Sequence, residues 1–175
     1  MKLPTDCPYR STRRSNRSAI ADLSGCCRDQ GWLLEDGEEP VCCTMGSESE
    51  VYRFVWRSTS HGRASVRIGR QGDRVALQWR YRRSFLDRDA PVPALAALSH
   101  DDWLRFQDVL ITANLWSLDP MDDRCGFDGA EWLIEGRRGN IYRGVSRWSP
   151  VGSFHDLGRL FCSLAGPPLS GVRLY

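Results

Sequence analysis

Residues 126–150 read GFDGAEWLIEGRRGNIYRGVSRWSP, and their pattern says more about the architecture than any other part of the chain. A glycine-bearing turn comes first, followed by an apolar run, a short polar turn at 137–140 and a second strand-like run. Residues 153–166 then place apolar side chains at helical spacing before a Gly-Pro-Pro stop. We therefore predict a β-hairpin followed by a helix over 154–165.

The turn at 137–140 also sets an expected register for this hairpin. If these four residues close it, Trp132 faces Val145 and Glu135 faces Tyr142. Glu131 then lies diagonal to Arg147, which predicts an ion pair between the two strands.

Upstream of the hairpin, residues 51–82 alternate large apolar side chains with arginine in three runs separated by glycine-containing turns. This period of two predicts an antiparallel meander with one buried aromatic face. Residues 99–117 carry a serine cap, acids in the first turn and a broad apolar face, which predicts a helix. The fold class is therefore α+β, an antiparallel β-meander and hairpin packed against two amphipathic helices. We expect five aromatic side chains to be buried: Trp56, Trp79, Trp103, Trp132 and Phe161.

The N-terminal part differs in character from the rest. Residues 1–48 are expected to be a poorly structured or leader-like segment, and residues 49–175 a single α+β domain. Residues 23–26 read LSGC, which resembles the cleavage box of bacterial lipoproteins and makes Cys26 a candidate for lipid attachment. The apolar run before this box is interrupted by Asp22, so a chance match is the alternative.

The metal-binding residue types do not fall into recognisable ligand patterns. The two cysteine doublets, at 26–27 and 42–43, lack the two-residue spacing that aims both sulfurs of a CxxC motif at one zinc ion. The four aspartates within 119–128 do not follow the alternation of a calcium-binding loop. We predict no metal site and no cofactor. The odd number of cysteines, seven, leaves at least one thiol without an intramolecular partner.

Charge is concentrated in the meander. Residues 51–83 hold nine arginines and one acid, a net charge of +8, whereas residues 1–50 and 84–175 each carry a net charge of −3. Alternation predicts that the strand arginines share the face opposite the aromatic core. That face is either a solvated surface or a binding surface for an acidic partner. The candidate binding residues are Arg53, Arg57, Arg67, Arg80 and Arg82.

The order of motifs over residues 50–166 resembles an uncharacterised family of small bacterial α+β proteins. The resemblance rests on EVYRF at 50–54, LWSL at 115–118, DGAEW at 128–132 and RWSP at 147–150. Many members of that family look like lipoproteins, which implies a location in the cell envelope or periplasm. The chain departs from the family in lacking a convincing apolar leader, and a cytoplasmic protein is the alternative.

The sequence leaves three classes of function open: an enzyme, a protein-binding module and a nucleic-acid-binding protein. The sequence contains neither a GxSxG nucleophile motif nor an HExxH metal motif, and no glycine-rich phosphate loop, so we do not expect an enzyme. Nucleic-acid binding would use the same arginines, but alternation sends the aromatic side chains to the opposite face, away from any base that could stack on them. We therefore expect a non-enzymatic protein-binding module of the bacterial envelope, of immunity or inhibitor type, with an acidic protein partner. Nucleic-acid binding, or an enzyme without a recognisable motif, is the alternative.

Overall fold

The computed structural model describes residues 41–43, 49–84, 94–122 and 126–174. The chain divides into two compact units, Met1–Gly46 and Ser47–Tyr175. In the first unit, the described residues form the short 3₁₀ helix η2 (Val41–Cys43). In chain order, the second unit contains β1 (Glu50–Ser58), β2 (Arg63–Gln71), β3 (Arg74–Arg82), β4 (Ala94–Ala97), α3 (His100–Ala113), η3 (Leu115–Ser117), β5 (Ala130–Arg138), β6 (Ile141–Trp148), α4 (Ser153–Ala165) and η4 (Leu169–Gly171).

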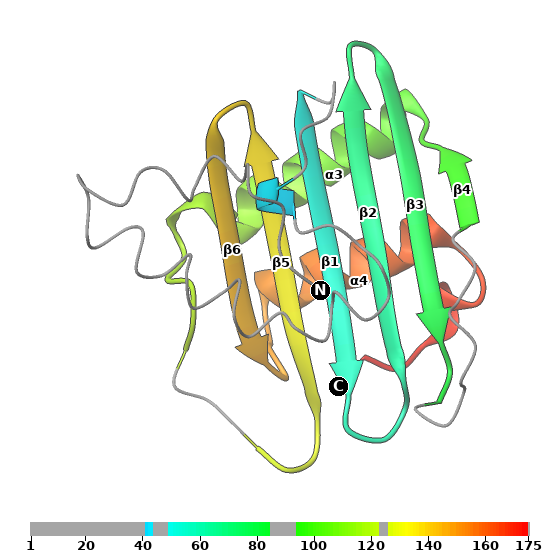
Figure 1. The fold of residues 1–175 in the computed structure, drawn as a ribbon, viewed down its shortest axis with the longest axis vertical. Helices are drawn as coiled ribbons and strands as arrows, with labels where there is room; N and C mark the ends of the chain where they lie inside the picture. The colour runs from blue at the N-terminus through cyan, green and yellow to red at the C-terminus, as the bar shows by residue number, and fades with distance from the viewer. Residues whose placement is uncertain (1–40, 44–48, 85–93, 123–125, 175) are drawn as a thin grey trace. The chain divides into compact units, whose positions relative to one another are not determined.

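The second unit is built on one antiparallel sheet of six strands in the order β4-β3-β2-β1-β5-β6. Strand β1 pairs with β2 on one side and with β5 on the other, so the meander and the hairpin become one sheet. Helices α3 and α4 both cross the same face of that sheet (Figure 1). The α+β class, with meander and hairpin against two helices, is confirmed.

The core lies between the sheet and the two helices. Side chains of alternate strand residues fill it, among them Phe54, Trp56 and Trp132, which are fully buried. Trp103 from α3 and Phe161 from α4 close over them. Four of the five aromatic residues expected in the core are buried, and the fifth, Trp79, is half-buried at its margin.

Local sequence accounts for both ends of α3. The hydroxyl of Ser99 accepts a hydrogen bond from the backbone N–H of Asp102 at 3.1 Å, which satisfies one of the unpaired donors of the first turn. At the other end Asn114 adopts the left-handed conformation at φ +52°, a role that asparagine tolerates better than most residues. The predicted helix over 99–117 is therefore α3 followed by η3.

Two details of the sheet differ from expectation. The hairpin register is displaced by two residues, because Arg138 pairs with Ile141 and the turn is made by Gly139 and Asn140. Gly139 has φ +56°, as the first central residue of a type II′ turn requires. The predicted pairings of Trp132 with Val145 and of Glu135 with Tyr142 are therefore wrong. The second difference is β4, which was not predicted and pairs with the edge of β3.

Candidate binding face of the sheet

Pairing across the sheet arranges the face opposite the helices in rows. One row contains Trp148 of β6, Glu131 of β5, Arg57 of β1, Arg63 of β2 and Arg82 of β3, each the register partner of the next. Two rows further along, the order is Glu135, Arg53, Arg67 and Gln78. Between them, Arg80 is the partner of Ser65. The five candidate arginines thus share one face, joined by Arg63, and we call these six residues the arginine face.

Three of these six arginines are direct neighbours. We call Arg57, Arg63 and Arg82 the arginine row, because they occupy three adjacent strands at one end of the face. Neighbouring strands lie about 4.8 Å apart, so the three arginine side chains start from adjacent positions on the face. Arg57 is exposed, and Arg63 and Arg82 are half-buried.

Arg53 has a different environment from the arginine row. Its side chain is fully buried and pairs with Glu135, which is also fully buried. The Nε of Arg53 donates to Oε2 of Glu135 at 2.6 Å, and the hydroxyl of Tyr142 donates to Oε1 of the same carboxylate at 2.6 Å. Arg53 therefore lies on the predicted face, but its charge is matched within the sheet and is not presented at the surface.

A pocket of about 460 Å³ lies at the Arg57 end of the face. Its lining combines a guanidinium, a carboxylate, two hydroxyls and an indole, from Arg57, Glu131, Ser58, Thr59 and Trp148. The predicted ion pair between Glu131 and Arg147 does not form. Arg147 is the register partner of Trp132, on the helix side of the sheet, and Nε of Arg147 lies 3.7 Å from Asp122. Glu131 instead accepts a hydrogen bond from Ser146 at 3.5 Å.

Two glycines fix the indole that forms one wall of this pocket. A side chain on Gly126 would place its Cβ only 2.6 Å from Nε1 of Trp148, and one on Gly129 would lie 3.1 Å from the same atom. Gly129 also has φ +146°, a conformation that favours glycine. The two glycines of the motif GFDG therefore allow the loop to pack directly on the ring of Trp148, which explains their place beside the RWSP segment.

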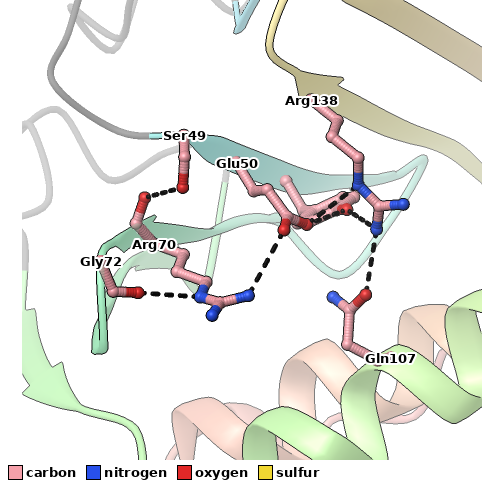
Figure 2. Close-up of polar contacts among 7 residues, drawn as sticks. Ser49, Glu50, Arg70, Gly72, Gln107 and Arg138 are labelled. Atoms are coloured by element: carbon pink, nitrogen blue, oxygen red, sulfur yellow. Dashed lines mark hydrogen bonds and ion pairs between the residues drawn. The ribbon is translucent and has the colours of Figure 1, made fainter.

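Not every arginine of the meander belongs to this face. Arg70 lies on the helix side, where Figure 2 shows Arg70 and Arg138 approaching Glu50. Nη1 of Arg70 lies 3.5 Å from one carboxylate oxygen, and Nε of Arg138 lies 3.2 Å from the other. Arg138 also donates to Oε1 of Gln107 on α3 at 3.0 Å, which ties the sheet to that helix. We call these four residues, with Tyr52, the Glu50 cluster.

The Glu50 cluster closes one end of the aromatic core. The hydroxyl of Tyr52 donates to Glu50 at 2.8 Å, and burial together with that carboxylate raises the pKa of Tyr52 well above its usual value. The guanidinium of Arg70 lies 5.5 Å from the ring centre of Trp103, and that of Arg138 lies 5.8 Å from the ring centre of Trp116. Both guanidinium groups therefore lie over aromatic rings of the core, which gives the cluster a structural role.

The histidines do not form a catalytic constellation with these residues. His61 lies in the exposed turn between β1 and β2, with Nδ1 at 2.7 Å from the hydroxyl of its neighbour Ser60. His155 of α4 packs on the indole of Trp132, with ring centres 5.2 Å apart. Within residues 41–43, 49–84, 94–122 and 126–174, no group of three or more metal-ligating side chains comes together.

Cys26, the candidate for lipid attachment, lies outside the described residues, as does most of the 1–48 segment. Neither α3 nor α4 has the length and apolar character that crossing a bilayer requires, and the same holds for every other described helix. Comparison of the sequence with models of protein families and with curated proteins found no match.

Proposed function

We propose that the chain is a non-enzymatic protein-binding module whose arginine row receives an acidic protein. The observation that carries the proposal is the arginine row, in which Arg57, Arg63 and Arg82 are consecutive register partners on three strands. A row of cations at this spacing concentrates positive potential along a line across the sheet. Carboxylates spaced along an extended or helical segment of a partner complement such a line.

The pocket beside Arg57 gives this face a second recognition element. Trp148 and Glu131 stand at the end of the arginine row, and an aromatic side chain beside a cation is a frequent centre of binding energy in protein interfaces. Nucleic acid is a poorer fit. Trp148 and Tyr142 are the aromatic side chains on this face among the described strand residues, both on β6, and the hydroxyl of Tyr142 is bonded to Glu135, so successive bases would have no series of rings across the arginines on which to stack.

Within the same proposal the module works in the cell envelope or periplasm, an expectation that rests on the sequence resemblance to lipoprotein-like bacterial proteins. An immunity or inhibitor protein of that compartment needs a matched binding surface and no catalytic group. The arginine row and the pocket beside it are features of charge and shape, which is what such a binding surface requires.

The experiment compares two variants with the same change in charge. The row variant replaces Arg57, Arg63 and Arg82 with serine. The control variant replaces Arg105, Arg159 and Arg173 with serine, three exposed arginines on the helices and the C-terminal segment. Partners captured from the native host by wild-type protein are identified, purified and titrated against all three proteins at several salt concentrations.

We expect an acidic partner whose affinity for the row variant falls about tenfold or more, with little change for the control variant and a decline with added salt. Equal binding by the row variant and wild type would overturn the proposal, and recovery of single-stranded nucleic acid would favour the alternative function. Intact-mass analysis of the protein from its host tests the location, because envelope anchoring predicts a mature chain that begins at acylated Cys26.

A further inference from the structure

A second pocket, of about 340 Å³, lies on the other side of the molecule from the arginine face, where α3, α4 and η4 meet. Its apolar lining comes from three elements, namely Val109 of α3, Leu160 of α4 and the C-terminal residues Leu169, Val172 and Leu174. Leu160 and Leu169 are buried members of the core, so the floor of this pocket is continuous with the interior. We call it the helix pocket.

Two cations border this apolar floor. Arg105 of α3 and Arg159 of α4 both line the helix pocket, and both are exposed. Neither makes a hydrogen bond or an ion pair with the described residues. Asp156 also lines the pocket, where it lies 3.6 Å from Nδ1 of His155. The charged lining therefore has a net charge of +1, with two guanidinium groups available to an anion.

Three further polar side chains line the helix pocket, of which Ser163 and Ser170 are exposed and the thiol of Cys162 is buried at the floor. Burial raises the pKa of Cys162 to about 12 although Arg159 acts in the opposite direction. At neutral pH the thiol is therefore protonated and behaves as a small apolar group. The floor of the helix pocket is uncharged, and its charges are confined to the rim.

We infer that the helix pocket binds a single-chain anionic amphiphile, with its acidic head on Arg105 and Arg159 and its alkyl chain on the leucine and valine floor. An anion such as free phosphate would gain nothing from the five apolar side chains, and a neutral lipid would leave both arginines unused. The volume of the helix pocket lies at the lower end of the range for small-molecule sites. It is too small to hold a protein segment of the size that a standard interface buries.

Dodecanoate, used below its micelle-forming concentration, is the first ligand to test. Its ¹³C-labelled carboxylate is followed by NMR during titration with the full-length chain. We expect saturable binding of one equivalent. Replacing Arg105 or Arg159 with glutamine should weaken binding by about two- to fivefold each, as for partly exposed ion pairs, and replacing both by about tenfold.

Three comparisons make the result decisive. Arg173→Gln removes an exposed arginine from the same C-terminal segment but not from the lining, and it should leave the affinity unchanged. Acetate, which has the head without the chain, should not bind, and dodecanol, which has the chain without the charge, should bind more weakly than dodecanoate. Lysophosphatidylglycerol with the same chain length identifies the source of the ligand. Tighter binding of this lysolipid would point to a membrane lipid, and tighter binding of dodecanoate to a free fatty acid.

The inference is overturned if neither dodecanoate nor the lysolipid binds saturably, if dodecanol binds as tightly as dodecanoate, or if the double arginine variant keeps wild-type affinity. All variants are first compared with wild type by thermal unfolding, and their exposed positions predict unchanged stability. The outcome is independent of the proposed function, because none of these substitutions lies on the arginine face.

Discussion

At the scale of single residues, Arg53 and Arg57 show how position decides what an arginine does. They are two rows apart on the same face of β1, and each has a glutamate of β5 as its register partner. Arg53 and Glu135 are fully buried, whereas Arg57 is exposed and Glu131 is half-buried. A buried ion pair requires each partner, because a single charge left behind has lost its hydration without compensation. The pair of Arg53 with Glu135 is therefore structural, whereas the side chain of Arg57 lies at the exposed end of the face.

This difference predicts the effect of removing each glutamate. Glu135→Leu should lower the free energy of unfolding by about 3–5 kcal/mol, because Arg53 is then buried without its counter-ion. The double variant Arg53→Met with Glu135→Leu should recover most of that loss. Urea unfolding measures both. Glu131→Leu is the matched control on the same strand and face, and we expect a change below about 1 kcal/mol. A Glu135→Leu chain as stable as this control would refute the structural role of the pair.

At the scale of elements, local patterns predicted most of the secondary structure and the strand neighbours within the meander and the hairpin, but not the hairpin register or β4. Alternation in residues 51–82 identified three strands and the face that carries their arginines. The register of the β5–β6 hairpin was missed by two residues, because both Arg138-Gly139 and Gly139-Asn140 are plausible two-residue turns and both allow a positive φ at Gly139. Strand β4 was missed because Ala94–Ala97 has no alternation, and its pairing with the edge of β3 defines it.

Helix α4 provides a prediction at this scale. A glycine in a helix ordinarily costs about 1 kcal/mol relative to alanine, so Gly158→Ala would stabilise α4 if the position were open. A Cβ at Gly158 would instead lie 2.6 Å from Cε3 of Trp132, a fully buried side chain. We expect Gly158→Ala to lower the melting temperature, with a loss of about 1–3 kcal/mol from overpacking.

The control for this substitution is Ser163→Ala, at an exposed position of the same helix, where the higher helix propensity of alanine should be neutral or slightly stabilising. Thermal unfolding followed by circular dichroism compares both variants with wild type. A stabilised Gly158→Ala variant would mean that α4 does not pack closely against Trp132.

At the scale of the whole molecule, the pairing of β1 with β5 could not be predicted from sequence patterns. Nothing in residues 50–58 or 130–138 indicates that β1 pairs with β5, because more than seventy residues separate them and each strand matches several partners equally well. The same pairing creates the ion pair of Arg53 and places Glu131 beside Arg57. The sequence therefore predicted which arginines share a face, whereas the arginine row, the pocket beside it and the helix pocket depend on tertiary structure.

The pairing of β1 with β5 also predicts that the meander and the hairpin unfold together. Trp56 and Trp132 are register partners at that junction, and the core they belong to extends from β3 to β6 and both helices. Trp132→Ala should remove about 3–5 kcal/mol of stability. Because the unit is expected to behave as a two-state system, this loss should reduce the amide-exchange protection of β2 and β3 as much as that of β5.

The control is Ile111→Ala, at an exposed position on α3, which should leave the amide-exchange protection of every strand within about 0.5 kcal/mol of wild type. If Trp132→Ala lowered the amide-exchange protection of β5 and β6 while that of β2 and β3 stayed at the wild-type level, the prediction would be wrong. The meander and the hairpin would then be independent folding units, although β1 and β5 are paired.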